Sequence, residues 1–270
     1  MSRILALLLL VSCTAYAQVY SSGVVRGGTF WGGLTTRVVE GLGEELVSIT
    51  NNMIACWPLD EAVATREDDW ASFDLTDNNT VTGTMGPTGL GNASSFAGAS
   101  LEYLSHADDA SLRMGDYSTT WVIWVNVTLS GFPAIISKEN GADRQFLLYH
   151  DGPANKFHWV VFDAIGNGDV TSTGTFAEGS GWHMIVCGYD KPNNRIFMSI
   201  DNGAMDTDTM LAAPIGGTAA LTFGEPNSGF DYLTGALAGA ALWNRLLTAI
   251  EREALYASGN GSRACEEQGN

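Results

Sequence analysis

The sequence is poor in positively charged residues. Its 270 residues include 13 Lys and Arg against 30 Asp and Glu, which gives a formal net charge of -17 at pH 7. A surface of this sign repels a phosphate backbone, so nucleic-acid binding is excluded as the main function. Cysteine is also scarce, with four residues whose spacing matches no zinc-binding motif.

Long hydrophobic runs are missing, and the one sustained apolar run is too short to span a bilayer. It extends over residues 4–11, follows Arg3 and precedes Ala15-Tyr16-Ala17. This order is typical of a secretory signal peptide covering residues 1–17. Residues 10–13 (LVSC) also resemble a bacterial lipobox, in which Cys13 would carry a lipid anchor. Both alternatives predict export, to the medium or to a surface.

The rest of the chain has the pattern of one antiparallel all-β domain. A glycine-rich segment, residues 18–50, is interpreted as an N-terminal arm, and residues 263–270 as a C-terminal tail. Between them, residues 51–262 contain short apolar runs separated by Gly, Asn, Asp and Pro. We expect strands at 121–128, 145–150, 156–163, 183–189 and 195–200. The one expected helix covers 248–257, because Thr248 and Glu251 form a capping box and Gly259 follows.

An ordered series of short motifs resembles the laminin-G-like branch of the concanavalin A-like lectin/glucanase superfamily, in its bacterial and phage-associated form. The series consists of residues 54–61 (IACWPLDE), 121–124 (WVIW), 135–138 (IISK), 181–183 (GWH), 201–203 (DNG) and the segment 237–259. The resemblance implies a jelly roll, a sandwich of two antiparallel sheets. The chain departs from the family after Gly235, where many members carry an Asp that is absent here.

Cleavage of the signal peptide would leave three cysteines, which cannot all pair within one chain. They are Cys56, Cys187 and Cys265. Cys56 and Cys265 lie near the two ends of the domain, which sandwich folds usually bring together. We therefore favour a Cys56–Cys265 disulfide and one buried thiol.

The sequence predicts no enzyme. Glycoside hydrolysis needs two carboxylates across the sugar bond, and related hydrolases carry them as Glu-x-Asp-x-x-Glu, which is absent. The histidines form no recognisable constellation with a nucleophile, and are interpreted as surface or core-edge residues. These are His106, His150, His158 and His183.

Four oxygen-bearing side chains lie within six residues and could bind Ca²⁺, which prefers carboxylate and amide oxygens. They are Asp74, Asp77, Asn78 and Asn79. The alternative is a turn in which these side chains bond to nearby backbone. Both interpretations stay open.

Three aromatic residues are candidates for a glycan-contact surface, because sugars are commonly bound on aromatic platforms flanked by polar groups. Trp70 follows an acidic loop, Trp159 lies in an expected strand with Phe157 and Val161, and Tyr232 follows Asp231. The other tryptophans at family positions are expected in the core.

These features favour an exported, non-catalytic carbohydrate-binding or adhesion module that recognises a surface glycan. The alternative is a structural subunit of a virion, an extracellular filament or a cell surface. In that case residues 18–50 would mediate homo-oligomer assembly and the sandwich would be displayed.

Overall fold

The computed structural model describes residues 24–25, 39–40, 49–115, 117–225 and 230–265. The chain divides into two compact units, Met1–Ile49 and Thr50–Asn270. The first contains the antiparallel pair β1 (Val24–Val25) and β2 (Val39–Glu40). The expected signal peptide, the alternative lipidation at Cys13 and most of the arm lie outside the described residues.

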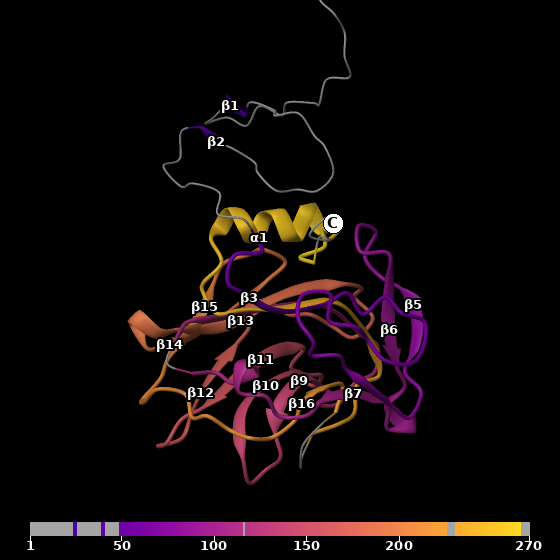
Figure 1. Ribbon diagram of the computed structural model, residues 1–270, viewed down its shortest axis with the longest axis horizontal. Helices are drawn as coiled ribbons and strands as arrows, with labels where there is room; N and C mark the ends of the chain where they lie inside the picture. The colour runs from indigo at the N-terminus through magenta and orange to yellow at the C-terminus, as the bar shows by residue number, and fades with distance from the viewer. Residues whose placement is uncertain (1–23, 26–38, 41–48, 116, 226–229, 266–270) are drawn as a thin grey trace, which may run out of the picture. The chain divides into compact units, whose positions relative to one another are not determined.

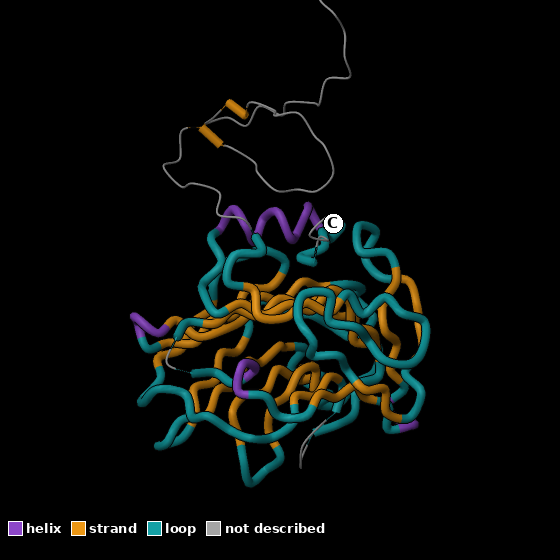
Figure 2. The backbone as a smooth tube through the Cα atoms, viewed as in Figure 1, coloured by secondary structure: helices purple, strands orange, loops and turns teal. Residues whose placement is uncertain are grey.

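The second unit is a sandwich of two antiparallel sheets, which confirms the predicted jelly-roll class (Figures 1 and 2). The first sheet has seven strands in the order β12 (Asn167–Thr171), β11 (Lys156–Phe162), β10 (Arg144–Asp151), β9 (Ala134–Glu139), β16 (Leu221–Phe223), β7 (Tyr103–His106) and β4 (Thr76–Asn78). The five strands expected from the sequence all coincide with observed strands.

The second sheet has eight strands. Its order is β15 (Asp206–Thr209), β14 (Arg195–Ile200), β13 (His183–Asp190), β8 (Thr119–Val127), β17 (Gly235–Trp243), β6 (Asn92–Phe96) and β5 (Thr82–Met85), with β3 (Met53–Trp57) also pairing with β17. In the part of the chain that the structure describes, four 3-10 turns connect strands or follow the helix, at η1 (Gly98–Ser100), η2 (Ala110–Leu112), η3 (Lys191–Asn193) and η4 (Ala257–Gly259).

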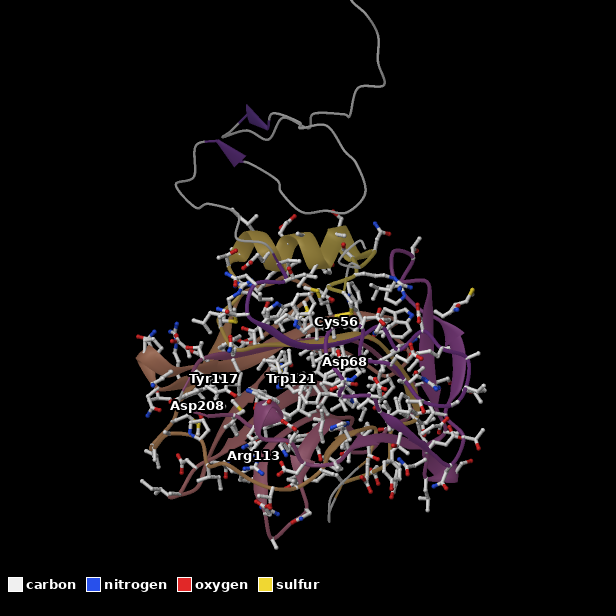
Figure 3. All side chains as sticks on the ribbon, viewed as in Figure 1. Cys56, Asp68, Arg113, Tyr117, Trp121 and Asp208 are labelled. Atoms are coloured by element: carbon white, nitrogen blue, oxygen red, sulfur yellow. A yellow bond between two sulfur atoms is a disulfide. The ribbon has the colours of Figure 1, made fainter. Side chains whose placement is uncertain are left out.

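The core lies between the sheets and is rich in aromatic rings. Trp57 and Trp121 are stacked with ring centroids 6.0 Å apart, and Phe223 meets both rings edge-on. Figure 3 shows Trp121 between the two sheets. Alternation along each strand sends these side chains inward, and their burial supplies the main stabilisation of the sandwich.

The short helix α1 (Ala249–Tyr256) packs on the outer face of the eight-stranded sheet (Figure 1). Its capping box forms as the sequence predicts: the Glu251 N–H donates to Thr248 Oγ1 at 3.2 Å, and the Thr248 N–H donates to Glu251 Oε2 at 2.8 Å. The ring of Tyr256 stacks on Trp124 of β8. Within the described residues, no helix is long and apolar enough to span a membrane.

A disulfide joins Cys56, in β3, to Cys265, the last described residue of the domain. This is the pair that the sequence favoured, with the Cα atoms 5.6 Å apart. Cys187 of β13 is free and buried, and that burial raises the pKa of its thiol well above the ordinary value. The thiol is therefore held protonated and unreactive.

Candidate functional site

The outer face of the seven-stranded sheet carries side chains that point away from the core. On β10 the residues Phe146 and Leu148 are in the core, so Leu147 and Tyr149 face outward. The one α-helix of the described residues packs on the other sheet, so no helix covers this face. Leu147 is itself buried beneath half-buried side chains that include Tyr149 and Phe230, and these side chains are what the face presents to a partner.

Three aromatic rings form a cluster on this face, which we call the Tyr149 cluster. Tyr149 and His158 are direct cross-strand partners, and their rings stack at 4.7 Å with 13° between the planes. Phe230 meets Tyr149 edge-on, with centroids 4.8 Å apart. All three side chains are half-buried. Burial, reinforced by Asp169 and Asp151, raises the pKa of Tyr149 to about 12, so its hydroxyl remains a neutral donor.

Polar groups flank the Tyr149 cluster. The His158 Nδ1 atom lies 3.0 Å from Asp169 Oδ1 and 3.2 Å from Thr171 Oγ1. Asp169 and Thr171 belong to β12 and are exposed at the edge of the sheet. A carboxylate and a hydroxyl therefore border the stacked rings on the solvent side.

A second aromatic pair, Tyr103 and Tyr232, stands farther along the same sheet. Tyr103 is on β7, and its ring centroid is 6.2 Å from that of Tyr232. Desolvation, and secondarily the charge of Glu225, raises the pKa of both hydroxyls. Burial also raises the pKa of Glu225. The two aromatic groups are joined by one stretch of chain, because Phe230 belongs to the first and Tyr232 to the second.

Small hydroxyl residues occupy the central strands between these groups. Ser137 of β9 is paired with Thr222 of β16, which is paired with Ser105 of β7. The Ser137 and Thr222 hydroxyls are 3.2 Å apart, and Asn78 donates to Ser105 Oγ at 2.9 Å. Ser137 and Thr222 are buried and Ser105 is half-buried, so the face offers aromatic surfaces at two places, with largely buried hydroxyl groups between them. Such a surface suits a ligand with flat C–H faces and a hydroxyl rim.

The structure corrects the prediction for Trp159. Its side chain is fully buried, donates from Nε1 to the Gly188 carbonyl at 3.1 Å, and packs on Phe146. The strand residues Phe157, Trp159 and Val161 do share a face, but that face is the core. Large apolar side chains at alternate positions are driven inward, so the exposed side belongs to His158 and its neighbours.

The structure places the other three predicted contact residues in different surroundings. Trp70 is half-buried, and its indole N–H donates to the Met53 carbonyl of β3 at 2.9 Å, so it does not join the aromatic groups of the seven-stranded sheet. Asp231 is exposed and accepts from the Phe132 N–H at 2.7 Å. Tyr232 does belong to the face, beside Tyr103.

The four side chains predicted to hold calcium bond to separate parts of the chain. Their partners are the Asp68 N–H for Asp74 (3.0 Å), the Val81 N–H for Asp77 (2.8 Å), Ser105 Oγ for Asn78 (2.9 Å) and the Leu101 carbonyl for Asn79 (2.7 Å). Asp77 also lies 3.9 Å from the buried guanidinium of Arg66. Among the described residues, no three His, Cys, Asp or Glu side chains are grouped to hold a metal. The contacts of Asp74 and Asp77 agree with the turn interpretation, whereas Asn78 and Asn79 bond to residues more than 20 positions away, and calcium binding stays a prediction.

Several residues of this face were not predicted: Tyr103, Tyr149, His158, Asp169, Thr171 and Phe230. Part of the signal was present, because the expected strand 156–163 has a second face made of His158, Val160 and Phe162. The stacking of Tyr149 on His158 depends on the register of β10 against β11, which strand patterns alone leave open.

Comparison with known proteins supports the fold. Among solved structures, the chain is similar to the binding domain of Paraclostridial Mosquitocidal Protein 1, with a TM-score of 0.66, 12% identity, and coverage of 78% of this chain and 53% of that one. The binding domain of Botulinum Neurotoxin DC, solved in complex with SialylT, gives a TM-score of 0.55 at 11% identity, covering 78% and 52%. Trypanosoma rangeli sialidase in complex with sialic acid gives 0.56 at 14%, covering 79% and 34%.

Identities of this size show a shared fold alone, and the chain spans about half or less of the length of those three proteins. No curated protein matches the chain significantly. A sequence model of the concanavalin A-like lectin/glucanases superfamily, by contrast, matches residues 99–251, more than half of the 270. This match confirms the resemblance seen in the sequence motifs, and the chain therefore belongs to the concanavalin A-like lectin/glucanase superfamily.

Proposed function

We propose that the protein is an exported glycan-binding module and that the outer face of the seven-stranded sheet is its binding surface. The observation that carries the proposal is the stack of Tyr149 on His158, with Phe230 edge-on, on a sheet face that no helix of the described residues covers. Half-buried rings of this kind are held in place by their neighbours, so a sugar can stack on them with little loss of side-chain entropy.

The polar groups around the rings supply hydrogen bonds to sugar hydroxyls. Asp169 and Thr171 flank the Tyr149 cluster, and the Tyr103 and Tyr232 hydroxyls are neutral donors. The net charge of -17 opposes polyanionic chains such as sulfated polysaccharides. We therefore propose a neutral oligosaccharide as the ligand, bound without cleavage of its glycosidic bonds.

The testing experiment is glycan-array binding followed by titration of the best ligand against three variants. Tyr149→Ala removes the stack, and we expect its Kd to rise at least about tenfold, or roughly 1.4 kcal/mol. Tyr149→Phe keeps the ring and should stay within about threefold of the parent. Tyr117→Ala is the matched control, since Tyr117 is a half-buried tyrosine whose hydroxyl donates instead to the Arg113 carbonyl.

A silent array, or equal weakening by Tyr149→Ala and Tyr117→Ala, would overturn the proposal. Light scattering on the same samples addresses the structural-subunit alternative. A stable oligomer that needs residues 18–50 and binds no sugar would support that alternative.

A further inference from the structure

Three side chains near one end of the sandwich form a hydrogen-bonded relay. Ser180 Oγ lies 2.9 Å from His183 Nε2, and His183 Nδ1 lies 2.7 Å from Asp201 Oδ2. The other carboxylate oxygen of Asp201 accepts from the Met184 N–H at 2.9 Å. This arrangement corrects the sequence prediction that no histidine belongs to a constellation with a nucleophile.

The fold fixes each member of this relay. His183 is the first residue of β13, and Asp201 directly follows β14. Since Ile185 pairs with Ile200 in the antiparallel hairpin, the start of one strand lies beside the end of the other. The edge of the Phe176 ring meets the imidazole at 4.9 Å, which limits rotation of the histidine.

The carboxylate of Asp201 sets the tautomer of the imidazole. An ionised carboxylate accepts only, so Nδ1 carries the proton and donates to Asp201. In the neutral ring, the lone pair of Nε2 then points at the Ser180 hydroxyl. The Ala177 carbonyl also lies within hydrogen-bond distance of Ser180 Oγ and competes for the same proton. Rotation about the Cβ–Oγ bond turns the Ser180 hydroxyl hydrogen from the Ala177 carbonyl to His183 Nε2.

Ser180 is open to a substrate. The residue is exposed, and it stands between Gly179 and Gly181, whose φ angles are 71° and 106°. A Cβ atom built on either glycine would meet nothing within 4 Å. Within the described part of the chain, the Gly181 N–H donates no hydrogen bond. It follows the serine directly, the position from which a backbone N–H stabilises an oxyanion in many serine hydrolases.

From this geometry we infer that Ser180 and His183 are the catalytic residues, and Asp201 the positioning residue, of a site that hydrolyses small acyl esters such as O-acetyl groups. Ser180 Oγ attacks the ester carbonyl while its proton passes to His183 Nε2. The C–O bond to the alcohol then breaks, and the alcohol leaves with that proton. Water then attacks the carbonyl of the acyl-serine in the same way, passing a proton to His183. The bond to Ser180 Oγ breaks, which releases the carboxylic acid and restores the serine hydroxyl. No atom within 4 Å of a Cβ built on either flanking glycine offers a contact to a long acyl chain, so we assign a small acyl group to the site.

This inference goes beyond glycan binding, and it shares no residue with the Tyr149 cluster or the Tyr103–Tyr232 pair. The chemistry concerns ester bonds, so it leaves the proposed non-cleavage of glycosidic bonds untouched. Failure of either proposal therefore leaves the other standing.

The test is hydrolysis of p-nitrophenyl acetate by the full chain. We expect Ser180→Ala to lower the rate at least about 100-fold, since loss of one member of a formed triad costs 10⁴ or more in evolved proteases. His183→Gln should give a similar loss. Asp201→Asn should lower kcat while leaving KM within about twofold, because it acts through the imidazole rather than on the ester.

Two variants serve as matched controls. Ser111→Ala changes an exposed serine, and His106→Gln changes a half-buried histidine whose Nδ1 bonds to the Asp74 carbonyl. Both should keep the parental rate. A Ser180→Ala rate equal to the parent, or an equal loss in the His106→Gln control, would overturn the inference.

A second measurement needs no variant. A fluorophosphonate probe phosphonylates a serine only where a neighbouring base activates it, with loss of fluoride. Peptide mapping of the treated chain should place the single modification on Ser180. No modification, or modification on another serine, overturns the assignment even if a variant fails to fold.

Discussion

The indole of Trp124 lies parallel to the phenol ring of Tyr256, with centroids 5.9 Å apart and 3° between the planes. Trp124 comes from the middle of β8 and Tyr256 from the last turn of α1, so this stack attaches the helix to the eight-stranded sheet. We expect Tyr256→Ala to lower the free energy of unfolding by about 2 kcal/mol. Tyr256→Phe, which keeps the ring, should be nearly neutral. Urea denaturation compares the two, and equal losses would show that the stack contributes nothing.

The Cys56–Cys265 disulfide should contribute strongly to stability, because it closes a long loop in the unfolded chain. We expect Cys265→Ser to lower the free energy of unfolding by about 3 kcal/mol. Thiol titration in denaturant should find Cys56 and Cys265 reactive only after reduction, whereas Cys187 should react as soon as the chain unfolds. Ready reaction of Cys187 in the native protein would contradict its burial.

Stability should fall in acid partly through Asp108. Its hydrogen bonds from Arg113 and Lys138 hold the pKa of the carboxyl at about 2, below the ordinary value of 3.8. A carboxyl with a lowered pKa in the folded state stabilises the fold above pH 3.8, and this contribution is lost as the pH falls toward 2. Asp108→Asn should therefore be less stable at pH 7 and should lose less stability between pH 4 and 2. Thermal unfolding across that interval measures both slopes, and parallel slopes would exclude Asp108 as a contributor.

The segment that contains Asp77 should matter for stability with or without calcium. Asp77 accepts from the Val81 N–H and faces Arg66, whose side chain is fully buried. Asp77→Ala removes a negative charge beside this buried positive charge, so we expect a loss of about 1–2 kcal/mol in the free energy of unfolding. The loss should be the same in a chelator and in excess CaCl₂. A calcium-dependent rise in melting temperature that Asp77→Ala abolishes would instead support the calcium interpretation.

Strand periodicity was enough to predict an antiparallel all-β domain, because apolar alternation and turn residues are local features of the sequence, whereas the two-sheet sandwich followed from the family resemblance. The same periodicity misplaced Trp159, since it shows which residues share a face but not which face meets solvent. The side chains on the Trp159 face are larger and more apolar than those on the His158 face, so the Trp159 face is the one that is buried. That comparison was available from the sequence.

The aromatic groups on the sheet were harder to predict. Tyr149 meets His158 only in the observed register of β10 and β11, and Phe230 reaches them from a connection far along the chain.

The hydrogen-bonded group of Ser180, His183 and Asp201 could be predicted in part. Strands 183–189 and 195–200 were both expected from the sequence, and the hairpin that they form in the structure places His183 beside Asp201. The contact of Ser180 depends on the backbone angles of the two glycines that flank it, which the sequence pattern does not specify.

The bond between Cys56 and Cys265 also decides how the domain would respond to mechanical load. A force applied between the chain before Cys56 and the chain after Cys265 passes along the first residues of β3 and through the two sulfur atoms, and it bypasses the strands that follow β3. The strands from β4 to β17 then carry no tension, and the sandwich keeps its shape while the link survives. Reduction would transfer the same force to the hydrogen bonds between β3 and β17, where separation of the strands would begin.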